Sequence, residues 1–289
     1  MRNDLLTWEG LRALATCEVL TPHPTRVILA TPDPARPVLK WKAQRHWFNR
    51  ATPMVPGCGA ILFARTAWRA PYRDLLLGQV RAPSVLVSAF CDSMIRPHAT
   101  ERLLADSSAI RRWFGVQVMT THPRLTAMPV GIEGSMVPVL QAAEQRSERD
   151  ILLYLNFARP HPFMGVAYLR DALWQTFAQW PWVTAVEQAD AATYAAHLGR
   201  AKFVLSPPGH GWDCYRTYEA MAMGAIPIVK RQPPMSNHLE ALPVLLVDHW
   251  SDVTPERLQH EWESRQPRSV ETMTMSYWRQ QILAAAKEC

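Results

Sequence analysis

The sequence has no long hydrophobic run. None of its apolar stretches approaches the roughly 20 residues that a membrane-spanning helix requires. The first residues also carry charges and lack a long apolar core; they read MRNDLLTWEGLRAL. We therefore expect no transmembrane helix and no signal peptide, so that any membrane contact would be peripheral.

Cysteine is scarce and follows no pairing motif. The five cysteines are odd in number, widely spaced and free of any CxxC pair; they are Cys17, Cys58, Cys91, Cys214 and Cys289. Such usage is typical of reduced thiols in a cytosolic setting and argues against a structural zinc site. We therefore predict a cytoplasmic protein, with peripheral contact at the inner face of a membrane as a compatible variant.

Charged residues make up only 19% of the chain, but their balance is basic, with a net charge of +6. A basic surface can attract nucleic acid, anionic lipid or an anionic substrate. No RNP-like aromatic signature, zinc-finger spacing or long basic helix accompanies the charge. We therefore predict no nucleic-acid partner, and we consider a membrane surface a better candidate partner than nucleic acid.

Predicted strands and helices alternate along the whole chain. In the first half, strands are expected at 26–30, 60–64, 84–90 and 116–120, with helices near 5–15, 72–77 and 99–104. In the second half, strands are expected at 151–156, 182–186, 203–206, 226–229 and 244–247, with helices near 164–179, 190–198, 214–223, 254–264 and 271–287. Strands separated by helices predict parallel sheets with both faces covered.

The polar segment 138–150, which contains QAAEQRSERD, marks the predicted domain boundary. A chain of 289 residues with 48% hydrophobic residues can build two domains with proper cores. We predict an α/β protein of two Rossmann-like domains, 1–138 and 139–289, facing each other across a cleft. The last helix, 271–287, is the segment expected to cross back onto the first domain.

The most informative stretch runs from Phe203 to Lys230 and reads FVLSPPGHGWDCYRTYEAMAMGAIPIVK. A short strand ends at Ser206, a turn rich in Pro and Gly follows, and Asp213 stands where an N-cap would open a helix over 214–223. Gly224 closes that helix before the next strand. Such a βαβ unit places the turn at the carboxyl edge of a parallel sheet, where a helix N-terminus can bind phosphate.

Arg216 and Glu219 project from one face of the predicted helix. The guanidinium and the backbone N–H groups of the turn suit the phosphates of a nucleoside diphosphate, and the carboxylate suits two ribose hydroxyls. An exposed ion pair worth about 0.3 kcal/mol is the alternative. Trp212 in the same turn can stack on a base or sugar, or can pack the turn onto the helix.

The order of these pieces carries a family resemblance. The run S-P-x-G, D-x-x-R-x-x-E-A and G-x-I-P-I, from Ser206 to Ile228, resembles the donor-binding segment of GT-B glycosyltransferases, most closely the exostosin-like family of inverting sugar transferases. Residues 151–157, ILLYLNF, look like the strand and turn that open the donor domain, and residues 113–114 and 128–132 are similar to the end of the first domain. The matches are scattered over about two thirds of the chain, and only 203–230 is specific.

The resemblance implies an inverting glycosyltransferase. Such an enzyme transfers a sugar from a nucleoside-diphosphate sugar, here a UDP- or GDP-sugar, to a hydroxyl of a glycan or lipid-linked acceptor, and it requires no cofactor. The donor-binding residues so implied are Asn156, Arg159, Ser206, Gly209, His210, Gly211, Asp213, Arg216 and Glu219. Alternatively, Asn156 caps the helix that follows and Arg159 is solvated. For His161, in the same loop, binding and a purely structural place stay equally open. His210 departs from the small polar side chain expected after the loop glycine.

Inversion needs a base that takes the proton of the acceptor hydroxyl. Asp92, just beyond the predicted strand 84–90, is the candidate, with His98 and His122 behind it. Asp92 could instead form a turn or cap a helix. Retaining GT-B enzymes of the common type carry a Glu eight positions before the match to Glu219, where this chain has Gly211, which favours inversion.

Metal-ligand spacing is also missing. The sequence has no HxxxH pair and no D-x-D placed just beyond a predicted strand, so we expect no required metal, although a divalent ion assisting the diphosphate stays compatible. Two other classes stay open. One is a catalytically inactive sugar-nucleotide-binding protein, and the other is a GT-B-like epimerase or phosphosugar transferase.

Overall fold

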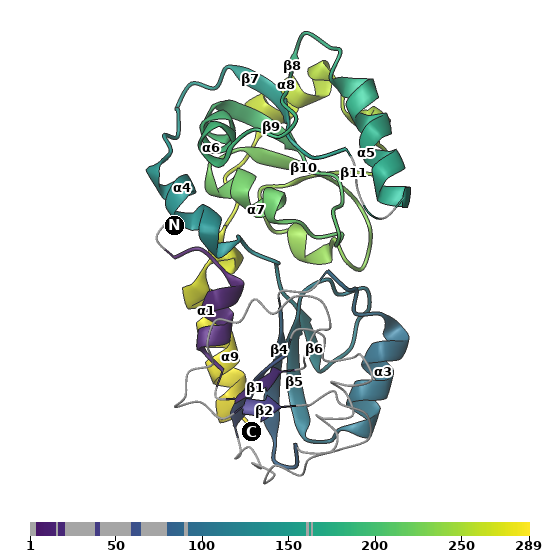
Figure 1. Cartoon of the computed structure of the whole chain (residues 1–289), viewed down its shortest axis with the longest axis vertical. Helices are drawn as coiled ribbons and strands as arrows, with labels where there is room; N and C mark the ends of the chain where they lie inside the picture. Colours follow the sequence, from purple (N-terminus) through teal and green to yellow (C-terminus); the bar gives the residue numbers. More distant parts are fainter. Residues whose placement is uncertain are drawn as a thin grey trace. The chain divides into compact units, whose positions relative to one another are not determined.

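The computed structural model describes residues 4–15, 17–20, 38–40, 59–64, 80–89, 92–159, 162 and 164–289 (Figure 1). The chain forms two compact units. The N-terminal unit comprises Trp8–Met128 and Met275–Cys289, and the C-terminal unit comprises Met1–Thr7 and Pro129–Thr274. The predicted strand 26–30, the predicted helix 72–77 and the positions Phe90, Cys91 and His161 lie outside the described residues.

The N-terminal unit is built on a sheet of parallel strands in the order β2-β1-β3-β4-β5-β6. The strands are β1 (Cys17–Leu20), β2 (Val38–Lys40), β3 (Ala60–Ala64), β4 (Ser84–Ser88), β5 (Ile110–Gly115) and β6 (Leu125–Ala127). Helices α1 (Trp8–Ala13), α3 (Pro97–Asp106) and α9 (Met275–Lys287) belong to the same unit. Trp113 is fully buried in its core, and its indole N–H donates to Ser88 Oγ at 2.8 Å.

One prediction for these elements is wrong. The strand expected at 116–120 is instead β5, which ends at Gly115. The backbone of Gln117 has a φ of 57°, and this left-handed conformation breaks an extended segment.

The C-terminal unit contains a sheet of parallel strands in the order β11-β10-β9-β7-β8. The strands are β7 (Ile151–Leu155), β8 (Val183–Ala185), β9 (Ala201–Leu205), β10 (Ile226–Lys230) and β11 (Leu245–Val247). Its helices are α4 (Val137–Ala142), α5 (Met164–Phe177), α6 (Ala191–Arg200), α7 (Tyr215–Ala222) and α8 (Pro255–Ser264). Short 3₁₀ helices span Gly134–Met136, Asn237–Leu239, Trp250–Asp252 and Glu271–Met273.

This sheet is buried on both faces. Tyr154 and Val204 pack into a cluster with α6 and α7, whereas Leu153 and Phe203 pack into a second cluster with α5 and α8. The alternation follows from the period of two along each strand. It confirms the predicted α/β class with covered parallel sheets, and both units are consistent with Rossmann-like domains.

Arg149 ties together the ends of two helices in the C-terminal unit. Its guanidinium donates to the carbonyls of Leu198 at 3.0 Å, Ala201 at 2.6 Å and Met223 at 2.6 Å, which lie at the ends of α6 and α7. Gly224 follows with a φ of 75°, and a Cβ there would lie 2.8 Å from Arg149 Nη2. Gly224 therefore ends α7 as predicted, since other residues would be strained and crowded.

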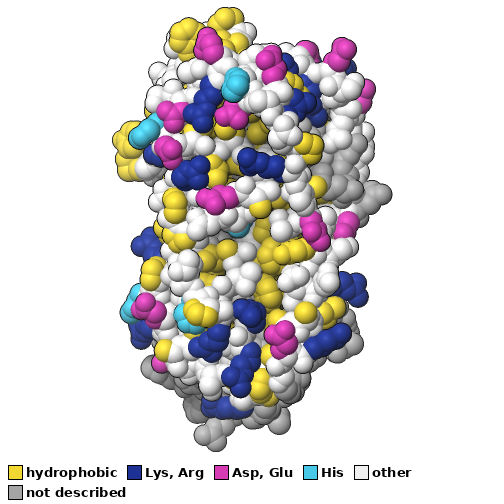
Figure 2. All heavy atoms as spheres, turned by 180° about the vertical axis from the view of Figure 1, so that it is seen from behind, with side chains coloured by type: hydrophobic (Ala, Val, Ile, Leu, Met, Phe, Trp, Pro, Cys, Tyr) yellow, Lys and Arg dark blue, Asp and Glu magenta, His cyan; other side chains and the backbone are white. Residues whose placement is uncertain are grey.

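No helix within the described ranges is both long and apolar enough to cross a membrane. Basic side chains are prominent on the N-terminal unit. Figure 2 shows one face of it, on which the dark blue Lys and Arg side chains outnumber the magenta acidic ones.

Candidate functional site

The strand order of the C-terminal unit points to one edge of its sheet. Counted along the chain from β7, the strands stand in the order 2-1-3-4-5 across the sheet from β8, so the direction of winding reverses between β7 and β9. Ligands of open α/β sheets bind at such a switch point, outside the carboxyl ends of the strands. The loops that leave there are 156–159, after β7, and 206–214, after β9.

The 206–214 loop is folded back on itself. Ser206 Oγ lies 2.9 Å from Thr217 Oγ1, and the Gly209 N–H donates to the carbonyl of Gly211 at 2.8 Å. Gly211 is buried and His210 is exposed. The Gly209 N–H is therefore engaged within the loop.

Arg216, in the first turn of α7, joins the two loops. Its Nε donates to the carbonyl of Asn156 at 2.9 Å, and its Nη1 donates to the carbonyl of Pro207 at 3.3 Å. The guanidinium also lies 5.5 Å from the centre of the Phe157 ring. The predicted position of Arg216 beside the turn is thus the observed one.

Sequence reasoning missed a second arginine at the same place. Arg170, in α5, is only 7% exposed, and it donates to the carbonyls of Pro208 and Ala158 at 2.9 Å each. Burial, together with the charge of the neighbouring Arg216, lowers the pKa of Arg170 to about 10. No local signal identified it, because an arginine followed by an aspartate in a helix is typical of a solvated surface.

Gly209 allows the loop to approach Arg170 closely. A Cβ at this position would lie 3.3 Å from Arg170 Nη2 and 3.4 Å from Cys214 Sγ, so a side chain would press on both neighbours. Burial also raises the pKa of Cys214 to about 11. The glycine is therefore explained by packing against the guanidinium.

Arg170 and Arg216 are joined to no carboxylate among the ion pairs of the described residues. Arg159 differs, since its guanidinium pairs with Glu187 at 2.9 Å and with Asp171 at 3.5 Å. Arg170 is buried and Arg216 is half-buried, and two like charges with no carboxylate in contact are unfavourable, so an anion bound between them would relieve the cost. The uncompensated charge at the switch point thus comes from Arg170 and Arg216.

Glu219 is buried on α7 and 7% exposed. Its Oε2 accepts a hydrogen bond from the Tyr194 hydroxyl at 2.8 Å. Burial raises the pKa of Glu219, while the Tyr194 hydrogen bond and the charge of Arg216 oppose that shift. The alternative of an exposed Arg216–Glu219 ion pair is therefore wrong, because the carboxylate is buried against a tyrosine of α6.

Asp213 does not cap α7. The N-cap of that helix is Cys214, which makes no side-chain capping bond. The buried Asp213 carboxylate instead accepts the Val130 N–H at 2.9 Å and lies 2.8 Å from the Tyr218 hydroxyl through each of its oxygens. The predicted cap is wrong because distant donors compete successfully for this carboxylate.

Asn156 and Trp212 lie in the two loops that leave the switch point. The Asn156 amide donates to the carbonyl of Val186 at 2.8 Å, which ties the loop after β7 to the chain after β8. Trp212 is half-buried, and its carbonyl lies 3.6 Å from Cys214 Sγ. Asn156 therefore shapes the carboxyl edge of the sheet beside Arg216.

The residues predicted for acceptor chemistry lie in the N-terminal unit. Asp92 is exposed in the segment between β4 and α3, and His98 is exposed in the first turn of α3. The N-cap of α3 is Arg96, so Asp92 is not its cap. His122 Nδ1 accepts the Arg124 N–H at 3.1 Å. The catalytic assignment of Asp92 and His98 stays a prediction.

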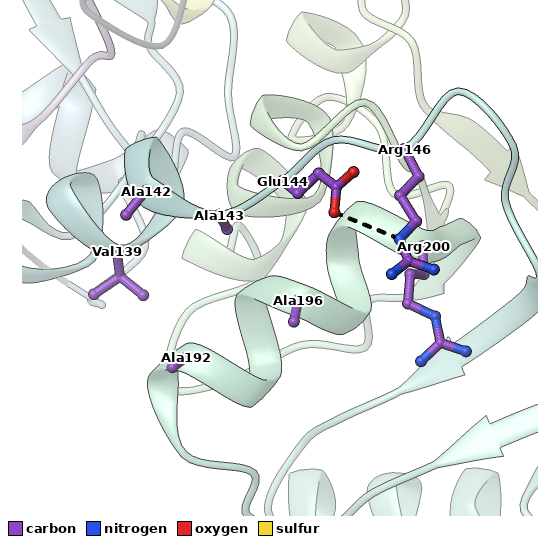
Figure 3. Close-up of a pocket in the computed structure, with 8 residues that line it drawn as sticks. All are labelled: Val139, Ala142, Ala143, Glu144, Arg146, Ala192, Ala196 and Arg200. Atoms are coloured by element: carbon purple, nitrogen blue, oxygen red, sulfur yellow. Dashed lines mark ion pairs between the residues drawn. The ribbon is translucent and has the colours of Figure 1, made fainter.

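A separate hollow of about 250 Å³ lies between α4 and α6 (Figure 3). The apolar residues that line it have small side chains: Val139, Ala142, Ala143, Ala192 and Ala196. Its rim arginines are compensated, since Arg146 pairs with Glu144 at 3.7 Å and Arg200 pairs with Asp150. The hollow shares no lining residue with the switch-point loops. Among the described residues, no group of three or more His, Cys, Asp or Glu side chains could hold a metal ion.

The comparisons with known proteins concern the C-terminal unit. The family model described as RXYLT1 C-terminal domain matches residues 168–282, a range that includes Arg170, the 206–214 loop, Arg216 and Glu219. No curated protein matches the chain. The family is one of glycosyltransferases, and it does not single out the exostosin-like group. The similarity, which covers less than half of the chain, supports a function of the glycosyltransferase type.

Proposed function

We propose that this chain is an inverting glycosyltransferase of the GT-B type that binds a nucleoside-diphosphate sugar at the β7–β9 switch point. One observation carries the proposal: Arg170 and Arg216 place two guanidinium groups on the loop after β9, and neither has a carboxylate partner among the described residues. A diphosphate supplies the missing negative charge in a form that guanidinium groups bind well.

The same charge would serve the reaction. When the sugar leaves, negative charge grows on the outer phosphate, and fixed cations in a partly buried site stabilise it more than they stabilise the substrate. Both guanidinium groups are already held by backbone carbonyls, so little reorganisation is needed at the moment of reaction. We therefore assign Arg170 and Arg216 to the leaving group.

Glu219 is proposed to bind the ribose. Its Oε2 is occupied by Tyr194, whereas its Oε1 makes no hydrogen bond within the described residues. A carboxylate oxygen can accept two hydroxyl hydrogen bonds. Glu219 follows Arg216 by three residues on α7, so the two side chains project from neighbouring positions on one face of the helix.

The acceptor side of the proposal rests on Asp92. An inverting transfer needs a carboxylate or imidazole that accepts the hydroxyl proton as the new glycosidic bond forms. Asp92 is exposed in the N-terminal unit, with His98 in the next helix. We propose that Asp92 is the base, with a glycan or lipid-linked hydroxyl as acceptor.

Thermal shift with a panel of nucleoside diphosphates and their sugars tests the proposal, since a ligand that binds only the folded state raises Tm. At least one of them should raise Tm of the wild type, and the rise should be lost in Arg216→Ala and in Glu219→Ala. Arg257→Ala, which removes a half-buried arginine of α8 paired with Asp252, should keep the full rise. Asp92→Asn should keep the rise and lower turnover. A wild type that responds to no nucleotide, or an Arg216→Ala variant that responds fully, refutes the proposal.

A further inference from the structure

The chain passes between the two units at three places, which follow Thr7, Met128 and Thr274. The stretches of the C-terminal unit next to these places are hydrogen-bonded to one another. The Leu6 N–H donates to the carbonyl of Met273 at 2.8 Å, and the Ile132 N–H donates to the carbonyl of Leu6 at 2.9 Å. We call residues 5–7, 129–132 and 273–274 together the crossing segment.

Further backbone pairing makes the crossing segment a single structural piece. Leu5 pairs with Thr274 in an antiparallel bridge, and Thr7 pairs with Ile132 in a parallel one. A change in hydrogen bonding at one of its three stretches therefore affects the other two.

The 206–214 loop is attached to the crossing segment through Asp213. The buried Val130 N–H donates to Asp213 Oδ2 at 2.9 Å, although the two residues are 83 positions apart in the sequence. Hydrogen bonds from a backbone N–H to a carboxylate are the strong kind, and burial shields this one from water. Asp213 thus belongs to the 206–214 loop and at the same time accepts a hydrogen bond from the crossing segment.

Two further side chains hold the Asp213 carboxylate in place. The Tyr218 hydroxyl lies 2.8 Å from both carboxylate oxygens, and His238 Nε2 lies 3.0 Å from that hydroxyl and 3.4 Å from Asp213 Oδ2. Since Tyr218 has one hydrogen to donate and gives it to Asp213, His238 donates to Tyr218. The carboxylate is thus held by Tyr218 from α7 and by His238 from the 3₁₀ helix Asn237–Leu239.

The loop itself is tied internally, so that a displacement of one part moves the rest. Gly209 and Gly211 are hydrogen-bonded, and the Cys214 thiol, next to Asp213, lies 3.7 Å from the carbonyl of Pro207. A ligand that shifts the loop toward or away from Arg170 therefore pulls on the residue that holds Val130.

We propose that Asp213 is a positioning residue that couples the 206–214 loop to the crossing segment. Binding at the loop changes how firmly the Val130 N–H is held, and by linkage any change at the crossing segment alters affinity at the loop. The ligand part of this inference rests on the proposed function, whereas the coupling itself belongs to the free protein.

Hydrogen exchange of peptides that span 129–132 tests the coupling without any ligand. Gly209→Ala disturbs the loop, because the added Cβ would lie 3.3 Å from Arg170 Nη2, closer than an ordinary contact. In the wild-type background it should change exchange at 129–132 by about fivefold or more. In the Asp213→Ala background, which lacks any acceptor for the Val130 N–H, the same substitution should leave exchange there unchanged. Thr254→Ala, which removes the N-cap of α8, is the matched control and should leave 129–132 unaffected in both backgrounds.

A merely structural role for Asp213 gives a different pattern. In that case Asp213→Ala and Gly209→Ala would each raise exchange, and their effects would multiply in the double variant. Multiplying effects, or an unchanged 129–132 peptide in Gly209→Ala alone, overturn the inference.

The ligand arm uses UDP, GDP and inorganic pyrophosphate as probes. A probe that raises Tm should slow exchange at 129–132 in the wild type, and in Asp213→Ala it should still raise Tm but no longer slow that exchange. Equal slowing in both proteins refutes the coupling. If none of the three probes binds, the proposed function falls, whereas the comparison with Gly209→Ala still decides the coupling.

Discussion

Replacing Arg170 by methionine should weaken the binding of a nucleoside diphosphate about thirtyfold. A hydrogen bond between two charged groups contributes about 2 kcal/mol, and 1.4 kcal/mol corresponds to a tenfold change in Kd. Arg170 is 7% exposed, so water screens its interaction with an anion only weakly. Methionine removes the charge, and with it the cation–π contact of the guanidinium 6.0 Å from the centre of the Phe157 ring, while it keeps a flexible apolar side chain of similar length.

Without ligand, the substitution should lower the free energy of unfolding by less than the loss of its hydrogen bonds alone suggests. The variant gives up the bonds to the carbonyls of Pro208 and Ala158, but it also removes the repulsion between Arg170 and Arg216. We expect a net loss of about 2 kcal/mol, which lowers Tm by about 4–8 °C for a domain of this size. The variant therefore stays folded at the temperature of a binding measurement.

Isothermal titration calorimetry at 20 °C or a similar temperature well below Tm is the appropriate assay. Arg170→Lys should bind better than Arg170→Met, because it keeps the charge without the planar fork. Arg257→Met should bind like the wild type. A Kd for Arg170→Met within about threefold of the wild-type value would refute the reasoning, since the buried charge would then contribute nothing to anion binding.

Other substitutions test the remaining physical arguments. Arg149→Met should lower the free energy of unfolding in urea by about 2–4 kcal/mol, because the carbonyls at the ends of α6 and α7 lose their donor; the exposed Arg200→Met should leave the midpoint unchanged. For Glu219, burial raises the pKa above its usual 4.5, so the folded protein keeps a proton that the unfolded chain has lost, and wild-type stability falls as pH rises through that window. The Tm of Glu219→Gln should therefore increase relative to the Tm of the wild type as pH rises above 4.5. A difference in Tm that does not change with pH would contradict the raised pKa of Glu219. Cys214, with a pKa raised to about 11, should resist iodoacetamide at neutral pH until guanidinium unfolds the protein, as peptide mass spectrometry would show.

Local pattern was enough to predict most elements of the C-terminal unit. The strands β7, β9 and β10 and the helices α5, α6 and α7 lie within a few residues of their expected positions. Their apolar periodicity and their end signals, such as Gly224, are properties of neighbouring residues, which the sequence displays directly. The strand expected at 116–120 failed because the left-handed Gln117 has no local marker.

The sequence by itself determined the parallel α/β class of both units and the strand, loop, helix and strand order of 203–230. It also determined that Arg216 and Glu219 share one helix. Only the tertiary structure decided which groups these residues meet. Glu219 lies against Tyr194, Arg170 reaches the carbonyl of Pro208, and Asp213 accepts the N–H of Val130. Helix and strand signals depend on neighbours a few positions away, whereas these partners are 25, 38 and 83 positions apart and meet only when the chain packs.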